Sequence, residues 1–304
     1  MGGVLRRFVR ERSALVGLAL VTVLVLAALL GPALWRDSPI AIDHALLGSP
    51  LAPSWAHPLG TDLLGRDEFA RALFGARISL TIGVTAMLVA VSLGVFYGAI
   101  AGFAGGVVDT VMMRVVDALL AFPTIFLVIT VEALANRFSL GTIVLVIGLF
   151  SWMGVARLVR GQVLSLRERE FVEAARALGA SPARLVVRHL IPNSLAPVTV
   201  AAALAIGDNI LAAAALSFIG LGIQIPTPSW GNMLQDALSP DARSAPWLIL
   251  TPGLLIVVTL LGFSLISDGL QVAFDRSIAQ EPGGAADEPS LAQFESLALA
   301  SREM

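Results

Sequence analysis

Residues 171–193 read FVEAARALGASPARLVVRHLIPN, a polar, arginine-rich stretch that lies between two long apolar segments. Phe171, Ala175 and Leu178 recur at i, i+4 and i+7, which is the spacing of one face of an α-helix. Gly179 follows at the place where the residue after a helix often takes a positive φ angle. This part of the stretch therefore predicts a short helix that a glycine turn closes.

A second short helix is predicted directly after the glycine. Ser181 and Pro182 are residue types preferred at the N-cap and the first helical position, and Pro192 is expected to end the helix. Its apolar side carries Leu185, Val186 and Leu190, and its basic side carries Arg184 and Arg188. Together the two helices predict a rigid helix–turn–helix that contacts a soluble partner. The alternative is a basic loop that only satisfies the positive-inside rule, but such a loop needs neither caps nor a glycine break.

The composition is that of a membrane protein without nucleotide chemistry of its own. Hydrophobic residues make up 57% of the chain and charged residues 14%, whereas soluble domains are roughly a quarter charged. Cysteine is absent, which excludes disulfides, thiolate metal sites and a cysteine nucleophile. Lysine is absent too, and a Walker-type loop needs its lysine to reach the β- and γ-phosphates. If the process uses ATP and Mg²⁺, we expect another polypeptide to bind them.

Six apolar runs are long enough to cross about 30 Å of hydrocarbon. They cover Leu15–Leu34, Leu80–Ala101, Leu119–Ala135, Leu140–Val155, Thr199–Ile219 and Leu248–Leu270. Only residues 136–139 separate the third run from the fourth, which suits a tight hairpin of antiparallel helices. The predicted fold class is an all-α, polytopic membrane protein with six transmembrane helices.

The distribution of arginine predicts the orientation in the membrane. Four arginines precede the first span, and seven lie between the fourth and fifth spans, so both segments are expected in the cytoplasm. Six spans then return the C-terminus to the same side. The predicted divisions are a cytoplasmic N-terminus (1–14), a transmembrane region (15–278) with an extracytoplasmic loop (35–77) and a cytoplasmic loop (157–196), and a flexible acidic tail (279–304).

Outside the spans, apolar and charged residues alternate at helical spacing from Asp62 to Arg77. This pattern predicts an amphipathic helix that lies along the outer membrane surface. At the inner ends of the spans, Arg114 and Asp117 stand at i, i+3 and predict a structural ion pair. Arg157 and Arg160 are interpreted as interfacial anchors.

Asp208 lies in the middle third of the predicted fifth span and is followed by Asn209. An aspartate at the bilayer centre costs about 2.5–3.5 kcal/mol on insertion scales, so it must face protein or water. We name Asp208, Asn209 and Ser217 as candidate residues of a translocation path; the alternative for Asp208 is a hydrogen bond to a neighbouring helix. His44, His57 and His189 are scattered, and no metal site, catalytic triad or paired-carboxylate site is expected.

The loop quoted above resembles a known pattern. Glu173-Ala174-Ala175, then Gly179, then Pro192 looks like the EAA loop of ABC-importer permeases, in which a short helix docks on a cytoplasmic ATPase. His189 replaces the isoleucine of the general pattern and resembles the dipeptide/oligopeptide/nickel branch. Further motifs of that branch are similar at residues 57–67, 113–123, 216–234 and 268–275. The resemblance covers residues 1 to about 278 and indicates the C-type permease subunit.

The resemblance implies a non-catalytic subunit that forms half of a translocation pathway for di- or oligopeptides in a bacterial inner membrane. It implies a homologous B-type permease, two cytoplasmic ATPase subunits or domains and an extracytoplasmic solute-binding protein as partners, with membrane lipid around them and no nucleic acid. The residues that it assigns to ATPase coupling are Glu173, Ala174, Ala175, Gly179, Ala183, Arg184, Leu185, Arg188 and Pro192. Ala213 stands where many relatives have a glutamate.

Three alternatives remain open at this point. The same machinery would serve for nickel chelates or glutathione, because the binding protein selects much of the cargo. A secondary transporter driven by an ion gradient would be expected to carry ionisable residues in several spans, and only Asp208 qualifies clearly. A membrane scaffold without transport activity would use the loop only as a docking platform.

Overall fold

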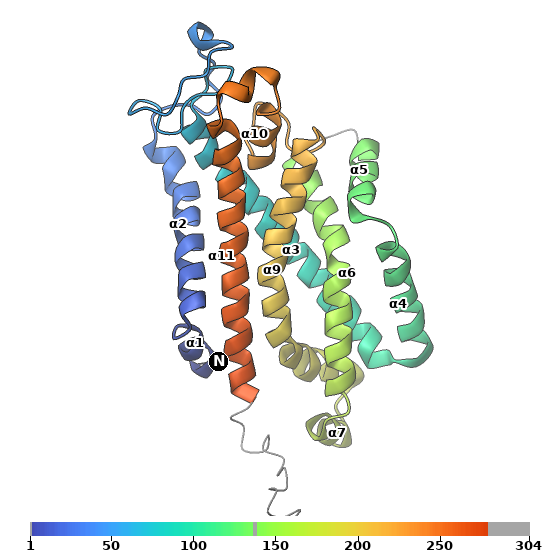
Figure 1. Cartoon of the computed structure of the whole chain (residues 1–304). Coiled ribbons are helices and arrows are strands. Elements are labelled where there is room, and N and C mark those ends of the chain that lie inside the picture. Colours follow the sequence, from blue (N-terminus) through green and yellow to red (C-terminus); the bar gives the residue numbers. More distant parts are fainter. Residues whose placement is uncertain (1, 136–138, 279–304) are drawn as a thin grey trace, which may run out of the picture.

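The computed structural model describes residues 2–135 and 139–278, and these are arranged almost entirely in helices (Figure 1). The elements in chain order are α1 (Gly2–Phe8), α2 (Arg12–Leu34), η1 (His44–Leu46), α3 (Glu68–Ala104), α4 (Gly106–Leu120), α5 (Thr124–Ala135), α6 (Leu140–Leu166), α7 (Glu170–Ala177), α8 (Pro182–Leu185), η2 (Val186–Leu190), α9 (Ile191–Phe218), α10 (Trp230–Asp236), η3 (Pro240–Ser244) and α11 (Trp247–Ile278). The described residues contain no β-strand apart from one isolated bridge between Thr61 and Asp67. The all-α prediction is confirmed for this part of the chain.

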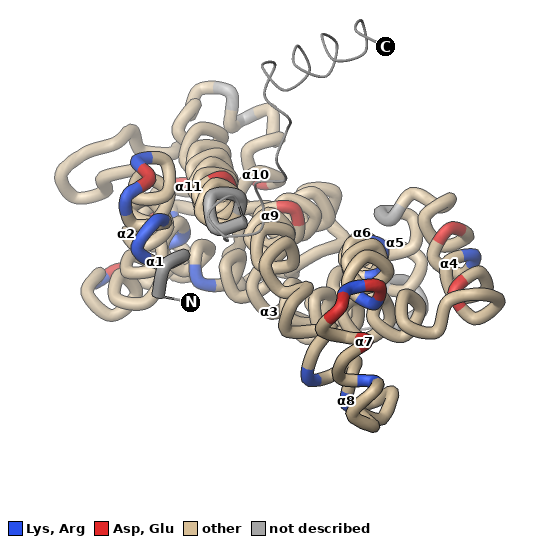
Figure 2. The backbone as a smooth tube through the Cα atoms, turned by 90° about the horizontal axis from the view of Figure 1, so that it is seen from below, with Lys and Arg blue, Asp and Glu red and all other residues tan. Residues whose placement is uncertain are grey.

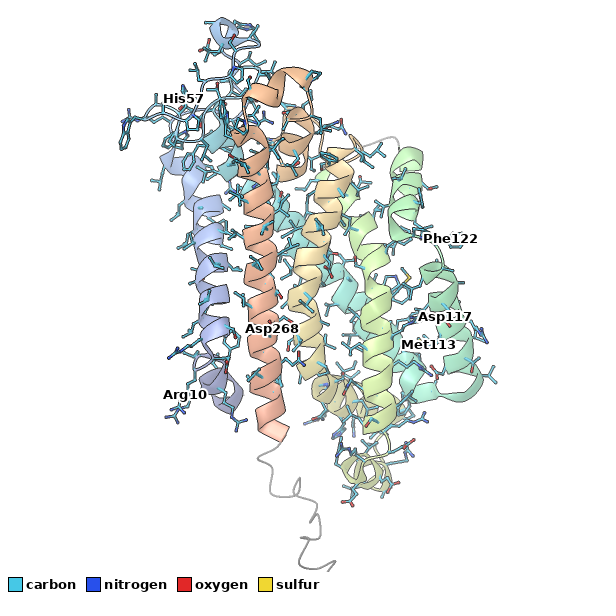
Figure 3. All side chains as sticks on the ribbon, viewed as in Figure 1. Arg10, His57, Met113, Asp117, Phe122 and Asp268 are labelled. Atoms are coloured by element: carbon cyan, nitrogen blue, oxygen red, sulfur yellow. The ribbon has the colours of Figure 1, made fainter. Side chains whose placement is uncertain are left out.

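Five helical segments in the described ranges are long and apolar enough to cross a membrane: Arg12–Leu34, Glu68–Ala104, Leu140–Leu166, Pro182–Phe218 and Trp247–Phe274. In Figure 1, α2, α11, α9 and α6 stand side by side, and α3 crosses obliquely behind them. The N-terminal helix α1, the loop helix α7 and the last described residues of α11 lie at one end of this bundle. Figure 3 shows Arg10 near that end and His57 at the opposite end. We call the first the inner end and the second the outer end, after the orientation that the sequence predicts.

The prediction of one continuous third span over Leu119–Ala135 was wrong. The chain breaks after α4 and resumes as α5, and the two helices lie one above the other along the edge of the bundle (Figure 1). The physical reason is Pro123, which lacks an N–H donor and disfavours helical geometry in the residue before it. That residue, Phe122, is 60% exposed and points away from the bundle (Figure 3). The tip of the predicted hairpin, residues 136–138, and the acidic tail, 279–304, lie outside the described residues.

The amphipathic surface helix expected over Asp62–Arg77 is also corrected. Asp67 caps a helix that starts at Glu68 and runs without a break through the second span, because no proline or capping glycine interrupts it. The Asp67 side chain accepts a hydrogen bond from the backbone N–H of Ala70 at 2.6 Å. The charged residues at this end of α3 are therefore enclosed by protein: Glu68 and Arg71 are each 1% exposed.

An ionic network holds the outer loop to α10. Asp62 binds the guanidinium groups of both Arg66 (2.6 Å to Nε) and Arg71, and its own side chain is 3% exposed. The carboxylate of Asp236, at the end of α10, binds the same two arginines at 2.9 and 2.7 Å. This network joins segments that are 165 or more residues apart in the chain. It packs α10 onto the outer end of α3, where Trp230 is completely buried.

Small residues allow α3 and α6 to pack closely. Gly94, Gly98 and Gly102 follow each other at four-residue intervals on α3 and face α6. A Cβ atom on Gly98 would lie 2.9 Å from the Cβ atom of Val159, which is closer than real side chains approach. Small residues repeated in this way are a common basis of helix association in membranes, because they let the two backbones come together.

Candidate functional site

The loop between α6 and α9 forms a compact structure at the inner end of the bundle. Figure 2 views the molecule from that end and shows charges of both signs around α7 and basic residues on α8. The α6 helix ends at Leu166, and the side chain of Arg167 then donates a hydrogen bond to the carbonyl of Gly102 at 3.1 Å. This bond fixes the start of the loop to the end of α3.

Gly179 closes α7 in the predicted way. Its φ angle is +82°, and the N–H groups of Gly179 and Ala180 donate to the carbonyls of Arg176 (2.9 Å) and Ala175 (3.0 Å). These two bonds are those of a Schellman motif, in which glycine is the preferred residue because it has no Cβ atom to strain at positive φ. The predicted glycine turn is confirmed.

The N-cap of α8 is confirmed as well. The Ser181 side chain accepts a hydrogen bond from the N–H of Arg184, and Pro182 occupies the first turn. Pro192, however, does not end this helix. The chain passes from α8 through a π-helical turn, η2, directly into α9.

Proline is tolerated at this position because the wide turn has already changed the hydrogen-bonding pattern. The N–H of Ile191 donates to the carbonyl of Val186, five residues earlier, and Pro192, which has no N–H, begins the first turn of α9. The Asn193 side chain donates a further hydrogen bond to the His189 carbonyl at 2.6 Å. The second half of the loop, from Pro182 onward, is consequently one continuous helical arm with the fifth span.

The buried face of α7 differs from the predicted one. Val172 is fully buried and Ala175 is partly buried, whereas Phe171 is 40% and Leu178 89% exposed. Val172 packs in one cluster with Leu185 and Leu190 of the second helix and with valines of α3 and α6, among them Val95, Val159 and Val163. The predicted apolar side of the second helix is thus confirmed for Leu185 and Leu190.

The predicted coupling residues divide into two groups. Glu173, Ala174, Gly179, Ala183, Arg184, Arg188 and Pro192 are exposed at the inner end, and Leu185 is buried with Ala175 partly buried. In the described part of the chain the Glu173 side chain makes no hydrogen bond or ion pair, so it does not fix the second helix. Sequence reasoning missed Leu178 as a surface residue; its place beside the exposed glycine turn was the available signal.

The three candidate path residues are not equivalent. Ser217 is buried, and its hydroxyl accepts a hydrogen bond from the N–H of Ile223 at 3.1 Å, which fastens the chain beyond α9. Asn209 is buried too and accepts a hydrogen bond from Ser151 of α6 at 2.8 Å. Of the three, only Asp208 is exposed, on the surface of α9. Its role as a path residue stays a prediction.

Ion pairs at the inner end differ from the predicted pair. Asp117 binds Arg157 rather than Arg114, and Asp109 binds Arg160 through two hydrogen bonds of 2.5 and 2.6 Å. The arginines interpreted as lipid anchors thus join α6 to α4. Their neighbour Arg114 lines a cavity of about 480 Å³ together with Asp117, Arg157 and Arg160.

These two pairs should contribute unequally to stability. The Arg157–Asp117 pair is half exposed on both sides, so Arg157→Gln should change stability by less than about 1 kcal/mol. Arg160 makes a bidentate contact with an Asp109 side chain that is 10% exposed, and Arg160→Gln should cost roughly 1.5–3 kcal/mol. Thermal unfolding of both variants in one detergent checks this order. Equal shifts for the two variants would contradict it.

A cluster at the outer end has the side chains of a metal site, but both oxygens of its Asp67 are already bonded within the protein. Ligand atoms of Asp37, His57 and Asp67 lie within 4.8 Å of one another. The two oxygens of Asp67 accept hydrogen bonds from Ala70 and Trp35 (3.2 Å) and bind His57 Nδ1 at 2.8 Å. We interpret the cluster as the structural start of α3.

The architecture defines a class: an integral membrane protein with several apolar spans and one structured, charged arm at a single end. Residues 94–280, more than half of the chain, match the family described as the binding-protein-dependent transport system inner membrane component. Residues 1–53 match the N-terminal transmembrane domain of oligopeptide transport permease C. The chain belongs to this family of ABC-transporter permeases, as the EAA resemblance predicted.

Individual relatives cover most of the chain. The dipeptide transport system permease protein DppC of Alkalihalophilus pseudofirmus is 42% identical over 88% of this chain and 86% of its own length. The oligopeptide transport system permease protein OppC of Bacillus subtilis is 39% identical, with 90% and 88% covered. OppC of Haemophilus influenzae is 37% identical, with 89% and 86% covered.

Proposed function

We propose that this chain forms half of the translocation pathway of a bacterial inner-membrane importer for di- or oligopeptides. The names of the relatives favour peptides over nickel chelates or glutathione as cargo. A homologous permease supplies the other half, two cytoplasmic ATPase subunits or domains bind ATP and Mg²⁺, and an extracytoplasmic binding protein delivers the solute. The chain itself carries no catalytic site.

In this proposal the chain crosses the membrane six times, with both ends in the cytoplasm. The five long helices supply five crossings, and α4 and α5 together, one above the other, supply the third in chain order. This count is supported by the location of α1, α7 and the end of α11 at one end of the bundle, where the arginine-rich segments also lie.

The observation that carries the coupling proposal is the continuity of the arm. Leu185 and Leu190 are buried against α3 and α6, and the helix that bears them continues through η2 into α9. A partner that displaces α7 and α8 therefore also displaces the inner end of α9, because no flexible loop separates α8 from α9. The ATPases are proposed to contact the exposed residues Glu173, Ala174, Leu178, Arg184 and Arg188.

Purification of the complex tests this function. The chain is tagged and extracted from its native membrane in mild detergent, and the co-purifying proteins are identified by mass spectrometry. We expect a second permease of the same family and a Walker-containing ATPase, and a retained binding protein would identify the peptide to assay. Recovery of the chain alone as a stable homo-oligomer would contradict the proposal.

Leu178→Asp should weaken the contact with the ATPase. Leu178 is 89% exposed at the end of α7, so an aspartate there leaves the fold of this chain intact. Burying that charge at an interface is unfavourable, and we expect at least a tenfold loss of ATPase recovered in the pull-down. The matched control is Leu238→Asp, at a leucine that is 61% exposed near the outer end. An equal loss of ATPase with both variants would contradict the assignment.

A further inference from the structure

Asp208 is an exposed carboxylate without a partner in the described part of the chain. It lies in the middle of α9, and its side chain makes no hydrogen bond or ion pair there. Its neighbour Asn209 points into the bundle and is bonded to α6. The two adjacent polar residues therefore differ: Asn209 belongs to the packing of α9 on α6, whereas the Asp208 side chain lies on the surface.

In the described part of the chain, α9 and the three spans α3, α6 and α11 that pack with it offer no basic residue at the same depth. No arginine, lysine or histidine occurs in residues 78–104 of α3, 140–156 of α6, 190–218 of α9 or 247–275 of α11. A carboxylate at the bilayer centre that faced lipid would cost about 2.5–3.5 kcal/mol on insertion scales. The face of α9 that bears Asp208 must therefore be turned toward water or toward a group outside this chain.

A groove begins at Leu204, one helical turn from Asp208, and lies toward the inner end. Its volume is about 450 Å³, and it runs between α6, α9 and α11, which stand next to one another in Figure 1. Leu204 lines it, and Asp208 follows on the same face of α9 one helical turn further out. The other α9 residues of the lining are Ala196, Pro197, Val200 and Ala201, at the spacing expected for one face.

The groove combines apolar walls with two amide side chains. Gln162 of α6 and Gln271 of α11 line it, and an amide can both donate to and accept from a peptide backbone. Apolar walls with few polar groups tolerate different side chains, as a path for varied peptides requires. A fixed negative charge one turn above such a groove is complementary to an ammonium group.

We infer that Asp208 is a cation-binding group of the translocation path and that it favours peptides carrying a basic side chain over peptides carrying an acidic one. This inference rests on the proposed peptide-import function. Asp208 contacts the ammonium or guanidinium group of the passing peptide, and Gln162 and Gln271 contact its backbone on the way to the inner end. Asn209 and Ser217 have structural roles in the helix packing and do not contact the solute.

The test is ATP-driven uptake into proteoliposomes by the complete complex, purified through a tag on this chain. The probes are the tripeptides Ala-Lys-Ala and Ala-Glu-Ala, each supplied at saturating concentration with the same binding protein. Because the binding protein is identical in every assay, its own preference cancels when variants are compared. We expect Asp208→Asn to lower the Lys-to-Glu uptake ratio by about tenfold, the scale of one charge-assisted hydrogen bond.

Two further variants separate recognition from structure. Asp208→Glu keeps the charge and should retain most of the wild-type ratio, whereas Leu211→Asn changes an exposed neighbour on α9 and should leave the ratio unchanged. An unchanged ratio for Asp208→Asn would overturn the inference, and a reduced yield of complex at that unchanged ratio would assign Asp208 to an ion pair with another subunit. Absence of ATP-dependent uptake by the wild-type complex would instead refute the proposed function itself.

Discussion

Replacing Gly179 with valine should abolish transport while the protein still folds and inserts. Gly179 has a φ angle of +82°, and a β-branched residue there is strained by about 1–2 kcal/mol or more. No atom lies within 4 Å of an added Cβ, so the effect comes from the backbone and not from a clash. We expect Gly179→Val to change the angle between α7 and α8 and to reduce uptake at least tenfold, with ATP hydrolysis continuing uncoupled.

Gly179→Asn is the matched control for this prediction. Asparagine tolerates positive φ better than other residues with a side chain, so it should keep most of the uptake although it is larger than alanine. The measurement is peptide uptake and ATP hydrolysis on the same proteoliposomes, with the amount of assembled complex determined in parallel. Normal uptake by Gly179→Val would refute the role of the glycine turn in coupling.

Asp62→Asn should strongly destabilise the outer end of the molecule. Asp62 binds Arg66 and Arg71, whose side chains are 8% and 2% exposed, and the variant leaves both arginines without their main counter-charge. Removing one partner of a buried ion pair costs about 3–5 kcal/mol. We expect the midpoint of thermal unfolding in detergent to fall by on the order of 10 °C.

Asp236→Asn provides the comparison, because Asp236 binds the same two arginines from a side chain that is 33% exposed. Water can replace part of its interaction, so the shift should be clearly smaller than for Asp62→Asn. The double variant should lose less than the sum of the two, since both residues share their partners. A larger shift for Asp236→Asn than for Asp62→Asn would show that the network is held from α10 instead.

The residue types at the turn predicted the turn between α7 and α8. They did not predict that the second helix continues into α9. Gly179 and Ser181 determine their own surroundings through positive φ and an N-cap hydrogen bond, and both are found as expected. Pro192 was expected to end a helix because proline removes a hydrogen bond from a regular α-helix. The π-helical turn before Pro192 has already changed the backbone hydrogen-bonding pattern. A departure from the 3.6-residue period over only five residues cannot be recognised in the sequence.

The buried face of α7 shows the limit of periodicity in a short helix. In an element of 8 residues, Phe171/Ala175/Leu178 and Val172/Ala175 are both acceptable apolar faces. The choice is made by the surface that receives the helix, here the valines at the inner ends of α3 and α6. The exposed Leu178 is therefore evident only once the packing is known.

Ion pairs between residues far apart in the chain could not be predicted from the sequence. Arg114 and Asp117 are correctly spaced for a pair within one helix, yet Asp117 binds Arg157, 40 residues later, because α4 lies against α6. The same holds for Asp236, whose partners are 165 and 170 residues away. The six apolar runs, in contrast, follow from hydropathy, whereas the helix break at Pro123, the start of α3 at Glu68 and the continuation of the second loop helix into α9 had to come from the structure.

If the arm of α7 and α8 receives force from an ATPase, as we propose, the two must be in contact, and site-specific cross-linking tests this contact. The chain contains no cysteine, so Leu178→Cys introduces a single thiol at the exposed end of α7. With a short bifunctional reagent in native membranes, this thiol should cross-link to a Walker-containing protein. Trp55→Cys, at a fully exposed residue of the outer loop, should not. A cross-link to the ATPase from Trp55→Cys but none from Leu178→Cys would contradict both the coupling site and the proposed orientation.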